Sequence, residues 1–141
     1  MEDQNKLLKS IMERQTVHDT LGIKTESYDF DKVVLSMEVT PKVHQPMGLL
    51  HGGVSCVLAE SAASFGAAIN LLPEKTAVGI ELNASHLKSV TSGLIVATAT
   101  PIRKGRKIHV WGIEIKDPQD NMICTARCTL AVVDLRLSQE S

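Results

Sequence analysis

The spacing of apolar and polar residues predicts a short amphipathic helix and two strands in the first third of the chain. Residues 3–16 place their apolar side chains on one side of a helix in a polar background. These apolar positions are Leu7, Leu8, Ile11 and Met12. Alternation over 22–30 and 32–40 then predicts two strands, and Pro41 ends the second.

The middle of the chain predicts a loop followed by a long helix of small residues. Pro46 and the glycines at 48, 52 and 53 form the loop, and the helix extends over 54–71 until Pro73 stops it. Its side chains are small on nearly every side, which predicts a helix that is buried all round. Gly66 costs about 1 kcal/mol relative to Ala in a helix, so we expect another element to approach it closely.

The rest of the chain predicts strands only. Alternating or β-branched runs occupy 76–87, 93–103, 107–116 and 122–134. The turns at 104–106 and 117–121 are short, so the last three strands are expected to be antiparallel neighbours. The predicted fold class is α+β: a curved antiparallel sheet wraps around the long helix, and a second copy covers the outer face of the sheet.

Amino-acid composition limits the classes of partner that the protein can bind, but it adds little about the fold. The 141 residues suit one domain, and a net charge of −1 with 3% aromatic residues offers nucleic acid neither a basic field nor a stacking platform. The first residues are charged and lack the apolar core of a signal peptide, and the stretch 52–72 is too polar for a membrane span. Three cysteines without metal or redox spacing indicate reduced core residues in a cytoplasmic protein; they are Cys56, Cys124 and Cys128.

Glu60 is the most unusual residue of the predicted long helix, because alanine and serine flank it on both sides. A carboxylate that is buried without polar partners loses its hydration at a large cost. One interpretation is a carboxylate held in a cleft as a nucleophile or general base. The other is a structural residue that reaches a sheet edge or an arginine.

The run His51-Gly52-Gly53 begins the same helix. Unpaired N–H groups at a helix start suit a carbonyl oxygen that becomes negative during acyl transfer, and glycine lets a ligand approach the backbone. The glycines also fit a simple turn into a helix, and the absence of a GxSxG motif excludes an α/β-hydrolase. Gly53 and Glu60 share a helix face about 10 Å apart along the axis. We therefore predict a site built from the helix start of one subunit and Glu60 of another.

Three further polar residues lie close to these two features in the sequence. Gln45 and His51 flank the loop before the helix, and both side chains are able to hydrogen bond a carbonyl or orient a water. Ser64 lies one turn after Glu60 on the same face, where it either holds the carboxylate or a water, or packs as a small core residue. The histidines lack metal-binding spacing.

The basic residues, Cys56 and the low aromatic content give weaker indications of how a ligand is bound. Lys88 and the basic turn 103–107 form either a solvated hairpin or a patch for the phosphates of a nucleotide-bearing ligand. Cys56 fits a core thiol better than a nucleophile. The few aromatic residues predict an acyl pocket lined by Met, Leu and Val rather than by stacked rings.

Three runs of residues together resemble the hotdog-fold acyl-CoA thioesterases, in the PaaI-like branch with the 4-hydroxybenzoyl-CoA and 1,4-dihydroxy-2-naphthoyl-CoA thioesterases. The runs are QPMGLLHGG at 45–53, LAES at 58–61 and GIELNASH at 79–86. The resemblance covers about residues 15–133. It implies a single hotdog domain over 1–141 with its core at about 15–135, a short N-terminal helix, and dimers with a shared site that assemble into tetramers.

The resemblance also implies which residues form the site. The catalytic positions match Glu60 as nucleophile or general base, Gly52 as donor to the thioester carbonyl, Gln45 and His51 as assisting residues, and Ser64 as a contact to water or the acyl ring. The CoA-contacting positions match Gly79, His86, Leu87, Lys88, Ser89, Arg103, Lys104, Gly105, Arg106, Lys107 and Ile108. CoA is part of the substrate, and no other cofactor is implied. The family often has an aromatic residue at the position of Met47 and an arginine at the position of Lys88. These two differences bear on which acyl group is accepted more than on the hydrolysis step.

The implied reaction is hydrolysis of an acyl-CoA thioester to a free acid and CoA. The implied acyl group is aromatic, such as 1,4-dihydroxy-2-naphthoyl, hydroxybenzoyl or phenylacetyl, and menaquinone biosynthesis is one pathway with such a step. Two alternatives stay open. One is a hotdog dehydratase acting on β-hydroxyacyl thioesters, with His51 as its histidine; the other is a noncatalytic acyl-CoA-binding module.

Overall fold

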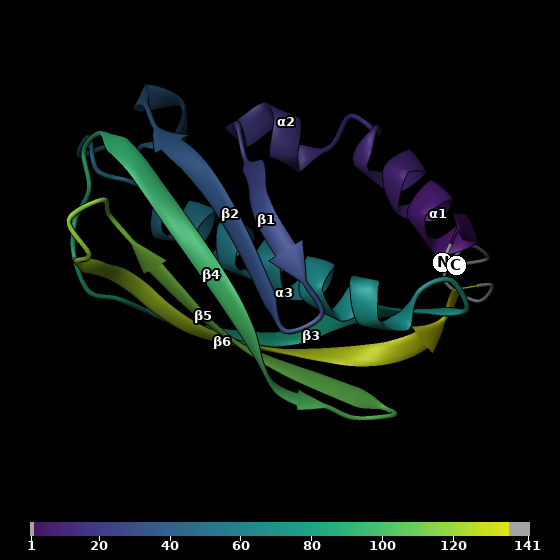
Figure 1. Ribbon diagram of the computed structural model, residues 1–141. Helices are drawn as coiled ribbons and strands as arrows, with labels where there is room; N and C mark the ends of the chain where they lie inside the picture. The colour runs from purple at the N-terminus through teal and green to yellow at the C-terminus, as the bar shows by residue number, and fades with distance from the viewer. Residues whose placement is uncertain (1, 136–141) are drawn as a thin grey trace.

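The structure is a computed structural model that describes residues 2–135, and a long helix lies against the concave side of a six-stranded sheet (Figure 1). Residues 1 and 136–141 of the predicted domain lie outside the described residues. The elements are α1 (Glu2–Met12), α2 (Val17–Leu21), β1 (Lys24–Asp29), β2 (Lys32–Val39), a 3₁₀ turn (Pro41–Val43), α3 (Gly52–Leu71), β3 (Lys75–His86), β4 (Gly93–Lys104), β5 (Ile108–Lys116) and β6 (Met122–Asp134).

The sheet has the strand order β1-β2-β4-β5-β6-β3, and each neighbouring pair is antiparallel. The predicted antiparallel neighbours β4, β5 and β6 are confirmed by their registers, in which Thr98 pairs with Glu114 and Glu114 pairs with Thr125. The α+β hotdog class is confirmed as well. β3 pairs only with β6, so this strand of 12 residues forms one edge of the sheet.

The core lies between α3 and the concave face of the sheet. Alternate residues of β5 point into it, and Trp111, Ile113 and Ile115 are buried. The predicted close approach at Gly66 is confirmed, because a Cβ atom there would lie 2.6 Å from the Trp111 ring. The glycine therefore makes room for the largest buried side chain.

The prediction that the long helix is buried all round is wrong for the single chain. One face packs on the sheet through Leu58, Ala59, Ala62, Ala63 and Ala67, all fully buried. The opposite face carries Glu60, which is exposed, and Ser64, which is half-buried. By length and composition alone α3 is apolar enough to cross a membrane, but buried core helices pass the same test. The small residues allow close packing on one face and leave the other open.

The N-terminal segment contains one more helix than its apolar pattern predicted. The predicted helix 3–16 ends at Met12, and α2 begins after Thr16. The Thr16 hydroxyl accepts the His18 N–H at 3.2 Å, and the Thr16 N–H donates to the Asp19 carboxylate at 2.7 Å. This reciprocal cap fixes the start of α2. The Gly22 backbone has a φ of 73°, the left-handed conformation that ends the helix.

Candidate active site

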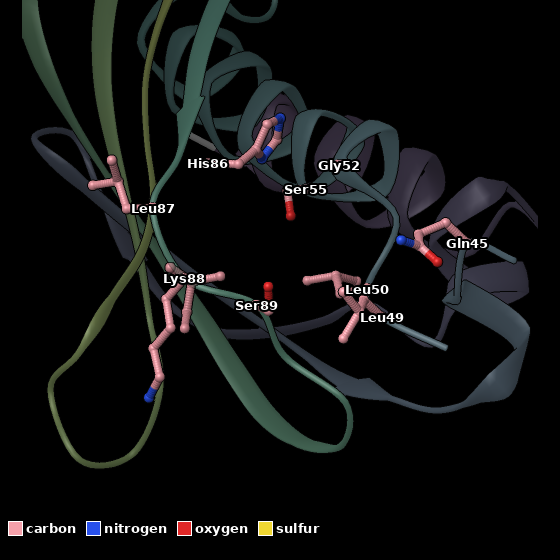
Figure 2. A pocket seen from close by; sticks show the side chains of 10 residues that line it. Gln45, Leu49, Leu50, Gly52, Ser55, His86, Leu87, Lys88 and Ser89 are labelled. Carbon is pink, nitrogen blue, oxygen red and sulfur yellow. The ribbon is translucent and has the colours of Figure 1, made fainter. Parts of the chain in front are cut away.

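A cavity of about 340 Å³ lies beside the start of α3 and is called the helix-start cavity here (Figure 2). The loop before α3, the first turn of α3 and the segment after β3 form its walls. Its residues are Gln45, Leu49, Leu50, Gly52, Ser55, His86, Leu87, Lys88, Ser89 and Ile123. The structure thus brings together two predicted catalytic residues and the predicted CoA-contacting residues 86–89.

The first turn of α3 leaves one backbone donor unused. The Gly53 N–H donates to Nδ1 of His51 at 2.8 Å, and the N–H groups of Val54 and Ser55 donate to the His51 carbonyl at 3.0 and 3.4 Å. Within residues 2–135 the Gly52 N–H has no acceptor. Because it also lies at the positive end of a 20-residue helix, this group is suited to bind a carbonyl oxygen that gains negative charge.

The loop before the helix turns the Gln45 amide towards this donor. The Gln45 N–H donates to the Leu49 carbonyl at 2.7 Å, and the Gln45 carbonyl accepts from the Gly48 N–H at 3.0 Å. The side-chain oxygen of Gln45 accepts from the Met47 N–H. The side-chain nitrogen points towards the cavity (Figure 2), where it can donate to a ligand.

His86 closes the cavity over the first turn of α3. A Cβ atom on Gly52 would lie 2.9 Å from Nε2 of His86, so glycine at this position lets the imidazole ring approach the helix backbone. The neighbouring Lys88 reaches the turn after β5, where its ammonium lies 2.8 Å from the Asp117 carboxylate. The hydrogen bond from Lys88, with others from Asn121, lowers the pKa of Asp117 to about 2.

A second cavity, of about 410 Å³, lies over the middle of α3 and is called the Glu60 cavity here. The open face of α3, the first residues of β3 and the two N-terminal helices form its walls. Its residues are Ile11, His18, Val57, Glu60, Ser61, Ser64, Phe65, Ala68, Thr76 and Ala77. Glu60 and Ser64 share this cavity, as their spacing predicted.

The Glu60 carboxylate lies against the edge strand β3. A Cβ atom on Gly79 would overlap Oε1 of Glu60, so a side chain at this position would displace the carboxylate. The pairing of β3 with β6 shifts register between Gly79 and Glu81, which marks a bulge beside the contact. Gly79 was predicted to contact CoA; in the structure it makes room for Glu60.

Glu60 and the helix start do not meet within one chain. Gly52 and Gln45 line the helix-start cavity, whereas Glu60 and Ser64 line the Glu60 cavity. The predicted arrangement, with residues from two subunits, is therefore the one that this geometry leaves open. His51 lines neither cavity among the residues above, and its ring nitrogen Nδ1 serves the helix cap.

The predicted CoA-contacting residues fall into two distant groups. Residues 86–89 lie at the helix-start cavity, but 103–108 form the turn from β4 to β5 at the far end of the 12-residue strand β4 (Figure 1). Ile108 pairs with Ala131, and Ala131 pairs with Val78, which lies eight residues before His86 on β3. At about 3.3 Å per residue, the two groups are therefore separated by roughly 26 Å along the strands. Lys104 lies 2.7 Å from the Asp31 carboxylate, beside the turn from β1 to β2.

The three cysteines are held as neutral thiols. Burial raises the pKa of Cys56 and of Cys124. Burial, with Glu60 and Glu81 nearby, raises the pKa of Cys128 to about 11. Because a nucleophilic cysteine needs the thiolate form, these values favour packing roles.

Sequence reasoning assigned a site role only to Glu60 and Ser64 among the residues of the Glu60 cavity. Ile11 was assigned only to an amphipathic helix, and His18 and Phe65 were not assigned a role. Of the expected Met, Leu and Val residues, the Glu60 cavity contains Val57, whereas Leu49, Leu50 and Leu87 line the helix-start cavity. The Phe65 ring lines the wall, and Tyr28 packs against it edge-to-face with ring centroids 4.9 Å apart.

Comparisons with known proteins agree with this geometry. The thioesterase superfamily matches over residues 47–124, which contain most of both cavities. A 1,4-dihydroxy-2-naphthoyl-CoA hydrolase of Listeria monocytogenes is 49% identical, over 82% of this chain and 94% of that relative. A thioesterase structure from Haemophilus influenzae is 40% identical with a TM-score of 0.83, over 86% of this chain and 85% of that one. The PaaI protein of Escherichia coli, at 22% identity, shares the fold with a TM-score of 0.84 over 94% of each chain. The chain belongs to the thioesterase superfamily.

Proposed function

We propose that the protein hydrolyses the thioester bond of an aromatic acyl-CoA to give the free acid and CoA. The observation that carries this proposal is the free Gly52 N–H at the start of α3, which shares a cavity with the side-chain amide of Gln45. The relative that is 49% identical is named a 1,4-dihydroxy-2-naphthoyl-CoA hydrolase, so this thioester is the first substrate to test. Hydroxybenzoyl-CoA and phenylacetyl-CoA are the next. The first of these acyl groups would place the protein in menaquinone biosynthesis, in the cytoplasm.

The complete site forms between two copies of the chain. β3 offers an unpaired edge of 12 residues, and Ile80 near its middle is 57% exposed. If two β3 strands pair antiparallel about their middles, the His86 end of one lies beside the Thr76 end of the other. His86 lines the helix-start cavity and Thr76 lines the Glu60 cavity. Such a dimer brings the helix-start cavity of each copy next to the Glu60 cavity of the other, so it contains two complete sites.

In the joined site the thioester carbonyl oxygen accepts the Gly52 N–H and a hydrogen bond from the Gln45 amide. Glu60 of the other copy either attacks the carbonyl carbon or removes a proton from a water that attacks. The oxyanion collapses, the carbon–sulfur bond breaks, and CoA leaves as a thiolate that takes up a proton. In the nucleophilic route, water then hydrolyses the mixed anhydride between Glu60 and the acyl group, which releases the free acid and restores the Glu60 carboxylate. Ser64, one turn from Glu60, holds the water or the acyl ring. No cofactor takes part.

CoA is held by residues from more than one copy. His86, Leu87 and Ser89 lie at the mouth of the helix-start cavity, where the pantetheine arm would leave. The basic turn 103–108 is too distant on the same chain, so we infer that another copy presents it to the CoA phosphates. This requirement favours the tetramer.

The structure gives a reason to prefer hydrolysis to dehydration. A dehydratase histidine has to accept or donate a proton at the substrate. In the neutral ring of His51, Nδ1 accepts the Gly53 N–H, so Nε2 carries the proton and cannot act as a base while the cap is intact. His51 therefore positions the helix start.

The test is release of free thiol from a panel of acyl-CoAs. The panel contains 1,4-dihydroxy-2-naphthoyl-, 4-hydroxybenzoyl-, phenylacetyl-, palmitoyl- and 3-hydroxybutyryl-CoA, with Glu60→Gln protein, purified identically, as the blank. We expect the fastest release from an aromatic thioester. Tight binding without release would support a noncatalytic module, and formation of crotonyl-CoA from 3-hydroxybutyryl-CoA would support a dehydratase.

A further inference from the structure

His18 lines the Glu60 cavity, although the proposed chemistry gives it no task. Its side chain is half-buried and shares the cavity with Glu60, Ser64 and Phe65. Within residues 2–135 its ring nitrogens have no hydrogen-bond partner and no ion pair. An imidazole in this position can donate and accept a hydrogen bond at the wall of a ligand-sized cavity.

The backbone holds His18 in a fixed place. Its N–H donates to the Thr16 hydroxyl at 3.2 Å, and its carbonyl accepts from the Ile23 N–H at 2.8 Å. Ile23 is buried, and Gly22 between them takes the left-handed conformation. Both ends of α2 are therefore capped and anchored, so the imidazole leaves the backbone from a defined point.

The remaining walls of the cavity suit an aromatic ring. Ile11, Val57 and Ala68 provide apolar surface, and Tyr28 holds the Phe65 ring in place at an interplanar angle of 70°. A volume of about 410 Å³ falls within the usual range of ligand sites, about 300–1,000 Å³. Glu60 and Ser64, on α3, are the polar groups assigned to the reacting bond. Ser61 lies next to Glu60 on α3, and Thr76 lies at the start of β3. His18, on the separate helix α2, is the polar wall residue outside these two elements and faces a more distant part of the cavity.

We propose, on the basis of the thioesterase function above, that His18 determines specificity by hydrogen bonding a hydroxyl group on the aromatic acyl ring. A neutral imidazole presents one donor and one acceptor, and a phenolic hydroxyl presents the same pair in return. An acyl ring without a hydroxyl leaves the imidazole unpartnered, which lowers its relative rate. His18 is thus a substrate contact remote from the thioester, and the protein prefers hydroxyaroyl-CoA to unsubstituted aroyl-CoA.

The test compares matched substrates in matched variants. The substrate pairs are 4-hydroxybenzoyl-CoA with benzoyl-CoA, and 4-hydroxy-2-naphthoyl-CoA with 2-naphthoyl-CoA; in both pairs the hydroxyl lies away from the thioester. The variants are His18→Leu, which removes both hydrogen-bonding atoms, and His18→Gln, which keeps a donor and an acceptor. Thr20→Ala is the control, because Thr20 is exposed on the same helix and lies outside the cavity residues.

We expect His18→Leu to lower the ratio of kcat/KM, hydroxylated over unsubstituted, by about threefold to tenfold in at least one pair. The value for the unsubstituted substrate should stay near that of wild type or rise, because no unpartnered imidazole remains, and His18→Gln should recover part of the ratio. Equal losses on both members of each pair would show a structural role and overturn the proposal. An unchanged ratio in both pairs would overturn it as well.

A binding measurement separates this proposal from the thioesterase function. Calorimetric Kd values for the same pairs are measured in a Glu60→Gln background, with and without His18→Leu. A shift of the Kd ratio by about threefold to tenfold supports the His18 contact even if the wild-type protein releases no CoA, which would refute the hydrolase alone. If the Kd ratio is unchanged while the wild-type protein hydrolyses its substrate normally, the His18 contact is refuted and the thioesterase function stands.

Discussion

The two faces of α3 are built from the same small residues but serve different purposes. On the face that packs on the sheet, Ala59, Ala62 and Gly66 allow the backbone to approach its neighbours, and Trp111 fills the space beside Gly66. On the open face, Glu60 and Ser64 border a cavity. The comparison teaches that composition does not distinguish the two faces of a helix rich in alanine and serine. Which face packs in the core and which face lines the site depends on the elements that dock against it.

The largest expected effect comes from the open face. Glu60→Gln removes the nucleophile or base and should lower kcat by about 10³-fold. Because Glu60 is exposed in the single chain, the free energy of unfolding should change little. Glu38→Gln, an exposed glutamate on β2, is the control and should keep full activity. Near-normal turnover in Glu60→Gln would refute the assignment of the carboxylate.

Mixed oligomers sharpen the comparison between the two cavities. Glu60→Gln and Gln45→Ala should each be nearly inactive alone. After subunit exchange, half of the dimers contain both variants, and each of these has one intact site. Activity should therefore return to about a quarter of wild type if the site is shared between copies. Mixtures without any recovery would show that Gln45 and Glu60 of the same chain act together, against the proposed dimer.

Gly79→Ala tests the contact between β3 and the open face of α3. The added methyl group overlaps Oε1 of Glu60 and should displace the carboxylate, with a loss of about 10- to 100-fold in kcat. Gly112→Ala is the matched control, because its Cβ would meet only Ile102, at 3.5 Å. Equal activity of the two variants would show that the position of Glu60 does not depend on Gly79.

Gly66→Ala tests the packed face. Its Cβ would lie 2.6 Å from the Trp111 ring, which cannot move freely in the core. The free energy of unfolding should fall by about 1–3 kcal/mol, as measured by urea denaturation. The kcat of the folded fraction should stay near wild type. A large loss of kcat with unchanged stability would contradict the division between the two faces.

The smallest expected effect lies at the rim of the helix-start cavity. Lys88 lowers the pKa of Asp117 to about 2 from an ordinary 3.8, so the pair stabilises the fold above about pH 4. This contribution is lost as the pH falls from about 4 through 2. Lys88→Met should raise the pKa of Asp117 towards its ordinary value, as followed by NMR titration of the carboxyl group. An unchanged pKa would show that Asn121 alone holds the carboxylate.

Most of the fold could be predicted because its strands alternate cleanly. The run 107–116 was predicted as a strand, and within it Trp111, Ile113 and Ile115, at every second position, are the buried apolar residues; the buried His109 shares their face. The start of α3 was placed two residues late, because Gly52 and Gly53 are typical of a loop. In the structure the His51 side chain caps the helix and makes these glycines its first turn.

The site could be predicted only in part, because its geometry depends on docking between elements. Residue type and spacing singled out Gln45, the glycines at the helix start and Glu60 as candidates, and the family resemblance assigned the donor role to Gly52. The signal for α2 was present in the Thr16 and Asp19 pair, but no local pattern shows that this helix would bring His18 to Glu60. The overlap of Gly79 with Glu60 joins residues on a strand and a helix, so spacing along the chain could not reveal it.

The division of α3 into a packed face and an open face has an evolutionary consequence. Substitutions at Val57 or Ala68, which line the Glu60 cavity and are only partly buried beside the core, alter the shape of that cavity while leaving the fully buried sheet-facing residues in place. Duplicated genes could therefore diverge in the acyl group that they accept without first losing the ability to fold. The same helix would meanwhile keep its alanine-rich face nearly constant through selection on stability.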